Sequence, residues 1–486
     1  MNFDPLPFEL RRKAFAEQVG DGLAVLVGAR ITARNSDVDH PFRQNSDFHF
    51  LTGFPEPDAV AVINPTHPSE RYVLFVNPKN RDEEIWTGWR AGVEGAREIY
   101  GADAAYPVDE LDAKLKQYSV GRTTIFYQPG FPEFDRRMLA LLGAGVDQRR
   151  LSGNPMPMRI EDPSHLLAEA RLIKSEPEIA NLRRACEISS QAHAEAMRHI
   201  RPGMYEYQIQ AVLEFVFRTL GAARDGYPSI VGSGPNSCIL HYIENRRQMQ
   251  DGELLLVDAG CEYEYFGADI TRTYPVNGRF SAPQRAVYEV VLAAQSKAMA
   301  AVRPGLAHTE LHEIAKRTVT EGLVELGLLP LSVEESLEYG HYREFFMHGT
   351  SHWLGLDVHD AGVYRVEGGG GRGLEPGMVF TVEPGIYIDP ARAELSLPLL
   401  RFDEDAFRER RNLVGLSEAT KELAQARSEA EQRKFVIPPE FLGIGVRIED
   451  DLLVTGTGGE NLSAACPRTV AEVEATCAEL SRMGEW

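Results

Sequence analysis

The sequence has few cysteines, and their spacing builds no recognisable framework. Five occur among 486 residues, they lie far apart, and no two form a CxxC pair; they are Cys186, Cys238, Cys261, Cys466 and Cys477. Neither a disulfide scaffold nor a zinc ribbon is therefore expected. We expect free thiols in a reducing, cytoplasmic location.

Positive charge and long apolar runs are also scarce. Lysine and arginine total 51 against 72 aspartates and glutamates, which leaves a formal charge of −21 at pH 7. Nucleic-acid binding usually needs a basic footprint, so we do not expect a nucleic-acid partner. The apolar runs are only as long as a strand, so no membrane partner is expected. The first residues also lack the basic-then-apolar pattern of a signal peptide.

The remaining composition is typical of a globular protein large enough for two or three domains. Hydrophobic residues make up 43% and charged residues 25% of the chain. Apolar segments at 22–28, 59–65, 71–78 and 123–130 alternate with helix-like stretches and end at Gly or Asn-Pro. This pattern predicts an α/β domain with a mixed or parallel sheet over 1–172. A second domain is then expected over 173–486.

A long helix is predicted to open the second domain. Ser175 and Glu178 have the spacing of a capping box, Pro177 suits a first turn, and Pro202-Gly203 would end the helix. An Arg-Pro-Gly break returns at Arg303, which lies 102 residues after the first one at Arg201 (303 − 201). Each break separates two helix-like segments that precede a strand-rich section. The repeat favours a duplicated unit of a helix pair and a sheet, although two similar helix ends would explain it too.

Four acids occur at strand ends in the second domain. Asp258 closes the apolar run LLLVD, and Asp269 precedes the strand-like TRTYPV, so a hairpin or near-hairpin would bring the two together. Glu383 follows a strand at a Pro-Gly turn. In GIGVRIEDD, the two-residue period of a strand places Arg447 and Glu449 on the face opposite the apolar side chains.

These acids and His352, in HGTSHWLGLDVHD, suggest a metal site. Each acid alone is ordinary turn chemistry. Gathered in one pocket without a cation, the carboxylates would repel and several would be protonated. Two divalent cations would remove the conflict, and oxygen ligands with one nitrogen suit metals such as manganese. A water between two metals would be a ready nucleophile.

Two further segments carry weaker predictions. Residues 391–435 are highly charged with both signs balanced, which predicts one or two solvated helices inserted in the second domain. A contact between subunits is the alternative for this segment. The glycine run at 368–371 is expected to be a flexible loop, because it lacks the lysine and the strand-to-helix setting of a phosphate-binding loop.

Long motifs in this chain resemble those of aminopeptidase P, the Xaa-Pro aminopeptidase branch of the "pita-bread" metallopeptidases. RQNSDFHFLTGFPEPDAV resembles the N-terminal part of that family, while DAGCEYEYFGADITRTYPVNGRFS and HGTSHWLGLDVHD resemble its catalytic part. The resemblance implies a creatinase/prolidase-type N-terminal α/β domain. It also implies a C-terminal α+β pita-bread catalytic domain with an internal pseudo-twofold. The implied activity is a metal-dependent exopeptidase that releases the first residue from peptides with proline second.

The resemblance also implies a role for each site residue. Asp258 would bind one metal, Asp269 and Glu449 would bridge both, and His352 and Glu383 would complete the second. A water or hydroxide would lie between the metals, and Glu383 would also shuttle its proton. The substrate pocket would be lined by His241, His348, His359 and Arg447. Among these, His241 and His359 would act in catalysis by stabilising the tetrahedral intermediate and orienting the substrate.

Several alternatives stay open. A prolidase, which cleaves only Xaa-Pro dipeptides, would use the same ligands and needs a group that captures the C-terminal carboxylate. Creatinase-like hydrolases and protein-binding pseudoenzymes share the fold but lack the full ligand set, and the large N-terminal domain disfavours methionine aminopeptidase. Manganese is the usual metal of the family, while zinc, cobalt and iron(II) use overlapping ligands. The family is commonly oligomeric, so a homodimer or homotetramer is expected.

Overall fold

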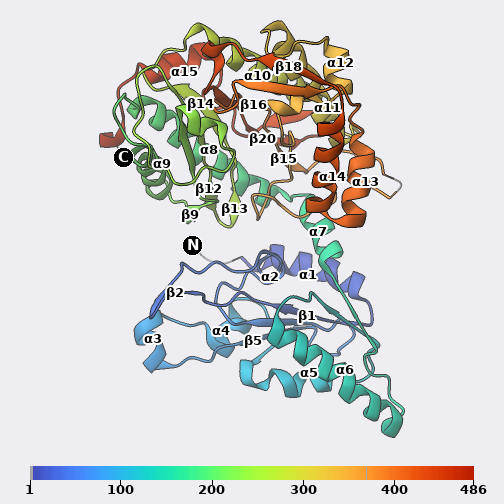
Figure 1. The fold of residues 1–486 in the computed structure, drawn as a ribbon. Coiled ribbons are helices and arrows are strands. Elements are labelled where there is room, and N and C mark those ends of the chain that lie inside the picture. The colour runs from blue at the N-terminus through green and yellow to red at the C-terminus, as the bar shows by residue number, and fades with distance from the viewer. Residues whose placement is uncertain (1–3, 368, 486) are drawn as a thin grey trace. The chain divides into compact units, whose positions relative to one another are not determined.

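The computed structural model describes residues 4–367 and 369–485. Gly368, which belongs to the predicted flexible loop at 368–371, lies outside the described residues. The chain divides into two compact units, the first ending at Arg171 and the second beginning at Leu172. Figure 1 labels their elements. Within the described part of the chain, no helix combines the length and apolarity needed to cross a membrane.

The first unit is built on a mixed sheet with the strand order β6-β5-β4-β1-β7-β8. Strand β4 pairs antiparallel with both β1 and β5, and the other pairs are parallel. The strands of this unit are β1 (Leu23–Val27), β2 (Ala33–Asn35), β3 (Val38–Asp39), β4 (Val60–Ile63), β5 (Tyr72–Val76), β6 (Ala104–Pro107), β7 (Thr124–Tyr127) and β8 (Arg159–Glu161). Its helices are α1 (Leu6–Val19), α2 (Ser46–Thr52), α3 (Arg81–Thr87), α4 (Gly92–Glu98), η1 (Val108–Glu110), α5 (Leu111–Ser119), α6 (Pro132–Ser152) and α7 (Ser164–Leu172).

The second unit combines helix pairs with short antiparallel sheets. Its helices are α8 (Glu176–His199), α9 (Glu206–Thr219), η2 (Gly234–Cys238), α10 (Ala282–Ala301), α11 (His308–Glu325), α12 (Val333–Glu338), η3 (His341–Glu344), α13 (Glu404–Val414), α14 (Leu416–Glu429), η4 (Pro439–Phe441) and α15 (Val470–Cys477). Its strands are β9 (Arg224–Asp225), β10 (Ile230–Ser233), β11 (Leu254–Asp258), β12 (Cys261–Tyr263), β13 (Phe266–Gly267), β14 (Thr271–Pro275), β15 (Val379–Val382), β16 (Gly385–Tyr387), β17 (Glu394–Pro398), β18 (Gln432–Val436), β19 (Gly445–Arg447), β20 (Asp450–Val454) and β21 (Gly459–Asn461).

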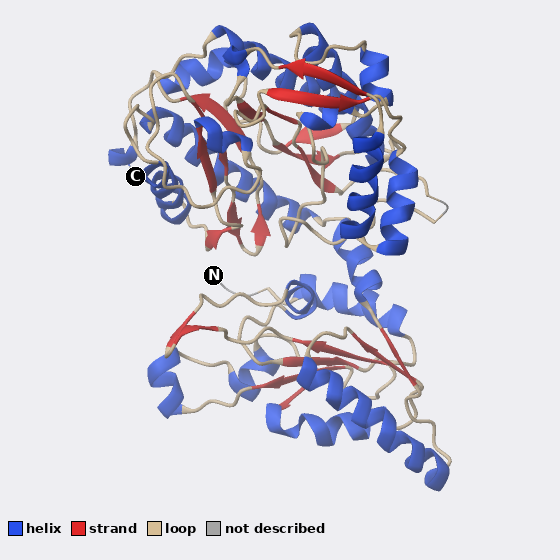
Figure 2. Ribbon diagram, viewed as in Figure 1, coloured by secondary structure: helices blue, strands red, loops and turns tan. Residues whose placement is uncertain are grey.

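The second unit repeats one arrangement, as the two Arg-Pro-Gly breaks suggest. Helices α8 and α9 precede the sheet β10-β11-β14, and α10 and α11 precede the sheet β15-β20-β21. Strands β11, β14, β15 and β20 are buried along their whole length. Figure 2 shows these strands with helices around them. Both faces of these strands are therefore covered, including the polar side chains of β14 and the two aspartates that begin β20.

The predicted capping box begins α8. The backbone N–H of Ser175 donates to Glu178 Oε2 at 2.8 Å, and the Ser175 hydroxyl donates to the same oxygen at 2.5 Å. Pro177 lies in the first turn, where it removes no helical hydrogen bond. The helix therefore starts where the sequence predicts.

The charged segment at 391–435 differs in part from the helices predicted for it. Only α13 and α14 are helical, and the two ends of the segment form an antiparallel ribbon in which Leu395 pairs with Phe435 and Leu397 with Arg433. Leu395 and Leu397 are buried in the same apolar core as α10 and α11. Alternation of apolar and polar residues in ELSLP is the local pattern that favours a strand over a helix. The helices and most of β18 lie at the surface, whereas β17 places two leucines of the ribbon in the core.

We expect Leu397→Ala to destabilise the protein far more than Leu413→Ala. Leu397 is fully buried, so its truncation leaves a cavity and should cost about 2–5 kcal/mol. Leu413 on α13 is 79% exposed, so its loss should change stability by no more than about 0.5 kcal/mol. Urea denaturation followed by circular dichroism measures the free energy of unfolding of each variant. Equal losses of stability would contradict the placement of Leu397 in the core.

Candidate metal centre

The first pair of acids is placed by the antiparallel strands β11 and β14. Asp258 is the last residue of β11 and pairs with Thr271, the first residue of β14. Asp269 lies two residues before Thr271, after the small hairpin formed by β12 and β13. The strand ends therefore bring Asp258 and Asp269 together, which is the near-hairpin that the sequence predicts.

The second pair is placed by four strands of the other half of the unit. Glu383 lies between β15 and β16, and Glu449 lies between β19 and β20. These strands pair across, so that Val382 is opposite Asp450 and Gly385 is opposite Arg447. The two glutamates thus sit at matching breaks in adjacent strands.

His352 comes from the loop before β15 and is tied to that strand. Its carbonyl accepts from the Thr381 N–H at 2.9 Å, and its own N–H donates to Thr381 Oγ1 at 3.3 Å. Its Nδ1 lies 3.1 Å from the carbonyl oxygen of Trp353. An Nδ1–H donated to that carbonyl leaves Nε2 facing the acids, the arrangement usual for a metal-binding histidine.

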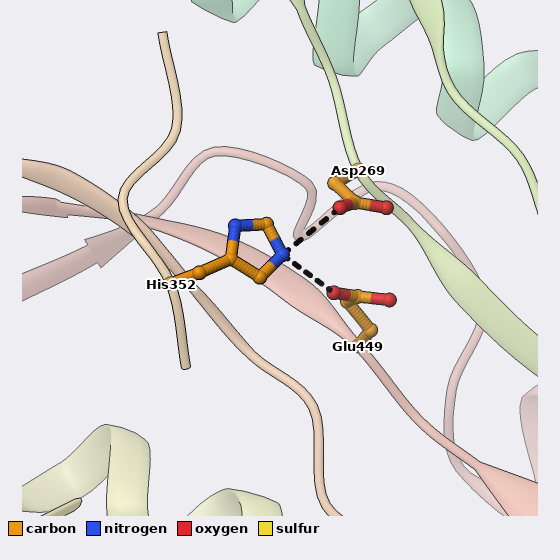
Figure 3. Close-up of side chains that lie close together, drawn as sticks. All are labelled: Asp269, His352 and Glu449. Atoms are coloured by element: carbon orange, nitrogen blue, oxygen red, sulfur yellow. Dashed lines mark ion pairs between the residues drawn. The ribbon is translucent and has the colours of Figure 1, made fainter. Parts of the chain in front are cut away.

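Five segments far apart in the sequence converge at one cavity of about 270 Å³. Ligand atoms of Asp269, His352 and Glu449 all lie within 4.8 Å of one another. Figure 3 shows the His352 ring with Nε2 directed at both carboxylates. From Nε2 the distances are 3.2 Å to Asp269 Oδ2, 3.7 Å to Glu383 Oε1 and 4.0 Å to Glu449 Oε1. Asp258 lines the same cavity, so all five predicted ligand positions meet there.

Three further polar side chains hold the acids in place. The Arg447 guanidinium donates through one terminal nitrogen to Asp258 Oδ2 at 2.6 Å, and through Nε to Thr271 Oγ1 at 3.1 Å. The Tyr227 hydroxyl lies 2.5 Å from Asp258 Oδ1 and 2.6 Å from Asp269 Oδ1. The Thr271 hydroxyl donates to Glu449 Oε2 at 2.6 Å. These contacts orient the carboxylates that face the cavity.

The raised pKa values of three acids show that ionised carboxylates are unfavourable in this site. Burial, followed by the charges of neighbouring acids, raises the pKa of Glu449 well above its usual value. Burial also raises the pKa of Asp258, and it raises the pKa of Glu383 to about 7. Burial opposes protonation of His352, but the hydrogen bond and charge of Asp269 raise its pKa to about 9.

These residues fit divalent cations. Raised carboxyl pKa values together with a raised histidine pKa mean that the cavity lacks positive charge. Carboxylate oxygens with one imidazole nitrogen form a donor set that suits hard or borderline divalent metals. The side chains able to hold the cations are those of Asp258, Asp269, His352, Glu383 and Glu449. Tyr227 and Thr271 orient three of these carboxylates through hydrogen bonds.

The other predicted site histidines line the same cavity in different positions. His241 and His359 are exposed at the cavity surface, and the His359 ring lies 4.3 Å from that of His352 between centroids. His348 lies deeper: its Nε2 is 2.8 Å from the Tyr387 hydroxyl, and its Nδ1 is 3.7 Å from Glu383 Oε2. Burial lowers the pKa of His348 to about 3, so it is neutral at pH 7.

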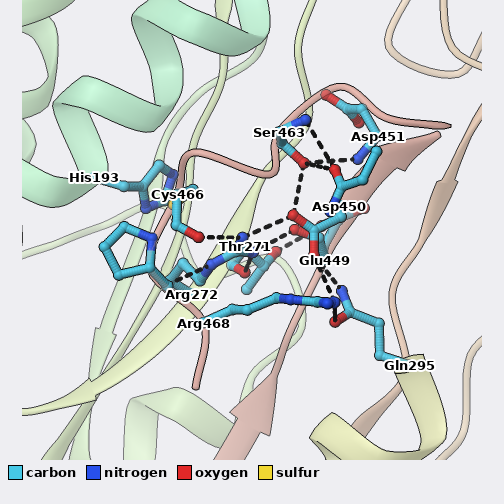
Figure 4. Close-up of polar contacts among 12 residues, drawn as sticks. His193, Thr271, Arg272, Gln295, Glu449, Asp450, Asp451, Ser463, Cys466 and Arg468 are labelled. Carbon is cyan, nitrogen blue, oxygen red and sulfur yellow. Dashed lines mark hydrogen bonds and ion pairs between the residues drawn. The ribbon is translucent and has the colours of Figure 1, made fainter. Parts of the chain in front are cut away.

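A buried polar network behind the site ties the two halves of the unit together (Figure 4). The Arg272 guanidinium donates to Asp450 Oδ1 at 2.7 Å and to the Glu449 carbonyl oxygen at 2.6 Å. The Asp269 N–H donates to Asp451 Oδ2 at 3.0 Å. Strand β14 and the break before β20 are therefore locked together. This fixes the carboxylate of Asp269 relative to that of Glu449.

Sequence reasoning missed Tyr227, Thr271 and Tyr387 as parts of the site. Thr271 could have been found, because it lies two residues from Asp269 and so shares its face in an extended strand. Tyr227 and Tyr387 carry no local motif. They reach the site only because β10 pairs with β11 and β16 pairs with β19.

Comparison with known proteins shows the family of this chain. A family model described as "Metallopeptidase family M24" matches residues 180–456, and one described as "Aminopeptidase P, N-terminal domain" matches residues 8–127. The Xaa-Pro aminopeptidase of Escherichia coli is 40% identical over 472 residues, covering 96% of each chain. The chain belongs to the aminopeptidase P branch of metallopeptidase family M24. The family predicted from the motifs is thus confirmed.

Other relatives extend this result to the fold. The Xaa-Pro aminopeptidase of Haemophilus influenzae is 37% identical and covers 96% of both chains. The solved structure of the Pseudomonas aeruginosa aminopeptidase PepP superimposes with a TM-score of 0.86 at 42% identity, covering 98% of each chain. The E. coli aminopeptidase P with the inhibitor Pro-Leu has a TM-score of 0.85 at 38% identity. The predicted fold of an aminopeptidase P is confirmed, and as a family M24 enzyme the protein is a hydrolase.

We expect Tyr227→Phe to weaken the binding of divalent metal by about 10–100-fold, the usual effect of losing a group that orients metal ligands. The hydroxyl lies within hydrogen-bond distance of both the Asp258 and Asp269 carboxylates, so its removal takes one orienting contact from each. The matched control is Tyr274→Phe, because the buried Tyr274 hydroxyl has no hydrogen-bond partner among the described residues. Isothermal titration calorimetry with Mn²⁺ measures both variants; equal affinities would show that Tyr227 does not orient the ligands.

Proposed function

We propose that the protein is a metal-dependent exopeptidase that releases the N-terminal residue from peptides with proline at position two. The observation that carries this proposal is the meeting of Asp269, His352 and Glu449 within 4.8 Å in a chain related throughout its length to Xaa-Pro aminopeptidases. Peptides with an Xaa-Pro start are the proposed substrates.

Five side chains are proposed to hold two divalent cations. Asp258 would bind one cation, Asp269 and Glu449 would be shared by both, and His352 and Glu383 would complete the second. Carboxylates suit bridging because each has two oxygens with several lone pairs. The support for this division is that carboxylate oxygens of Asp269, Glu383 and Glu449 lie 3.2, 3.7 and 4.0 Å from His352 Nε2. The Asp258 carboxylate is instead bound by Arg447 and Tyr227.

The cations supply Lewis acidity that activates water for attack on a peptide carbonyl. The protein side chains do the rest. Glu383, with one oxygen facing His352 and the other facing His348, carries the proton of the attacking water. His241 and His359, at the cavity surface, orient the substrate and stabilise the charge that develops on its carbonyl oxygen. His348 lines the pocket as a neutral ring beside Tyr387.

Arg447 is proposed mainly to balance charge. The structure occupies its three nitrogens with Asp258, Thr271 and the Tyr387 hydroxyl. A guanidinium held this way favours the ionised form of Asp258 and so opposes the rise in its pKa that burial causes. It also leaves little freedom for Arg447 to reach for a substrate.

Selectivity for proline follows from the chemistry of the scissile bond. A proline nitrogen has no N–H, and its ring fixes the backbone, so a shaped pocket can accept it. The free amine of the first residue can take a remaining metal position, which would restrict cleavage to the chain start. A prolidase is the alternative function. It is disfavoured because the relatives that match the whole chain are named Xaa-Pro aminopeptidases.

Manganese is the proposed metal, with zinc, cobalt or iron(II) as alternatives that use overlapping ligands. The oxygen-rich donor set supports manganese, and metal analysis of the purified protein would identify the ion. A reducing cytoplasm is the proposed location. It is supported by the five cysteines, which are all free thiols. Subcellular fractionation tests the location.

A homodimer or homotetramer is the proposed assembly. Support comes from Ile85, Trp86 and Trp89 of the first unit, which are 70%, 87% and 94% exposed in the single chain. A cluster of exposed large apolar side chains usually marks an interaction surface. Light scattering after size-exclusion chromatography measures the subunit number, and a monomer at all concentrations would contradict this proposal.

The function is tested by offering the manganese-loaded protein an Xaa-Pro dipeptide, an Xaa-Pro-Xaa tripeptide and a longer peptide. We expect the tripeptide and the longer peptide to lose their first residue, and a chelator to abolish this cleavage. Mass spectrometry of the products identifies the cleaved bond. Cleavage of the dipeptide alone would instead establish a prolidase.

Two variants separate the proposed ligands from the pocket histidines. Glu449→Ala should remove activity together with bound metal, because it deletes a bridging carboxylate. His359→Ala should lower kcat by about 10²–10³-fold, as expected for loss of one group that stabilises the transition state, with metal content unchanged. Steady-state kinetics beside elemental analysis gives both quantities. Loss of metal from His359→Ala would assign that ring to the ligand set.

A further inference from the structure

A second and larger cavity, of about 800 Å³, adjoins the metal cavity. The two share His348, Gly349 and Ser351 in their walls, so they meet along the loop that precedes His352. Its volume is in the range of pockets that bury a ligand of several residues. The cavity lies wholly within the second unit, and the proposed ligand set takes no residue from it.

The charged insertion builds one wall of this cavity. Residues 401–403, in the join that precedes α13, line it together with Glu404, Asp405 and Arg408 of that helix. The join is anchored, because the Phe402 N–H donates to the Glu338 carbonyl oxygen at 2.9 Å. The Phe402 ring also packs on Gly340, where an added Cβ would come within 3.1 Å of it. The wall is therefore a fixed part of the fold.

The opposite wall comes from α11 and supports the shared loop. His308 Nε2 lies 2.9 Å from Ser351 Oγ, and His312 Nδ1 lies 2.9 Å from Thr350 Oγ1. Burial lowers the pKa of both histidines, so they are neutral at pH 7. They hold the loop through hydrogen bonds and add no charge to the cavity.

The acids of the cavity are largely neutralised by their neighbours. Five cationic and four acidic side chains line it. Glu313 pairs with Lys316 at 2.5 Å, and Asp405 pairs with Arg408 at 2.6 Å. Glu404 lies 3.5 Å from the same arginine.

The other charged side chains that line the cavity are Asp403 and three arginines. Asp403 accepts from the Ala406 N–H at 2.9 Å as the cap of α13, and Arg365 lies 4.0 Å from Asp405. Among the residues that the structure describes, Arg343 and Arg401 have no carboxylate within ion-pair distance. The Arg343 guanidinium is held 4.8 Å from the centre of the Phe402 ring, which restrains it without neutralising it.

We propose that this cavity binds the part of the peptide that follows proline, and that Arg343 and Arg401 recognise a carboxylate there. The inference rests on the proposed function. An aminopeptidase substrate begins at the metal site and has nothing before its first residue, so any length beyond that site extends on the C-terminal side. The adjoining cavity is a path for that length, and its two unpaired guanidinium groups match a carboxylate in charge and geometry.

The recognised carboxylate can come from two sources, the end of a short peptide or an acidic side chain in a longer one. Four peptides distinguish them: Ala-Pro-Ala-Ala with a free carboxylate, the same peptide amidated, and amidated peptides with Glu or Lys in the last position. The variants are Arg343→Gln, Arg401→Gln and the double variant. Arg411→Gln is the matched control, because Arg411 is an exposed arginine of α13 that does not line the cavity.

We expect the wild-type protein to prefer carboxylate-bearing peptides over the plain amide by about tenfold in kcat/KM, as two partly exposed charge pairs allow. The double variant should lose this preference through KM, with kcat on the plain amide unchanged, because the contact lies away from the scissile bond. Arg343→Lys with Arg401→Lys should restore part of the preference, and Arg411→Gln should keep all of it.

The outcomes separate this inference from the function on which it rests. Cleavage of all four peptides without preference, or a preference that survives the double variant, overturns the inference and leaves the proposed function intact. Preference for the free carboxylate alone assigns the cavity to the chain end, and preference for the Glu peptide assigns it to acidic side chains. Failure of the metal-loaded wild-type protein to cleave any of them overturns both. Matching thermal melting curves show that the variants are folded.

Discussion

Mutual repulsion among buried carboxylates is the constraint around which the second unit is organised. Asp258, Asp269 and Glu449 are buried and Glu383 is half-buried beside them, and burial raises the pKa of most of this group. A buried charge is costly unless it is paired, so such a cluster persists only where cations and hydrogen-bond donors offset it. Arg447 supplies one fixed positive charge. Divalent cations would meet the rest of the demand, and this demand is what makes the cavity a candidate metal site.

The same repulsion explains why the acids come from strand ends locked by a second layer of polar contacts. Acids on mobile loops would move apart, but here each is attached to a buried strand. The Arg272 guanidinium bonds the Glu449 carbonyl oxygen and the Asp450 carboxylate, while the Asp269 N–H bonds Asp451. Because these contacts join the two repeated halves, a movement of one half would also displace the other. Groups held in this way are organised for a cation before it binds.

The charged insertion shows how a surface segment can act on a buried site. Its helices α13 and α14 bury almost nothing, yet its ribbon places Leu395 and Leu397 in the core. The join between ribbon and helix consequently has a fixed position, and it brings Arg401 to the wall of a cavity that adjoins the candidate metal site. The composition of the segment predicts only solvated helices. A charge pattern indicates which residues are exposed, but it does not indicate where the two ends of a segment pack.

The sequence by itself determined the family, and it predicted a boundary near Ile173, a helix start at Ser175 and five candidate ligands, whose side chains line one cavity. All of these follow from local patterns, such as apolar runs, cap spacing and motifs around each acid. Tertiary structure alone decided which groups support those acids. Tyr227 and Tyr387 arrive through strand pairing, and Arg343 faces the insertion only after the chain has folded. Long-range pairing depends on the register between distant strands, and no local pattern around a tyrosine or an arginine records its partner.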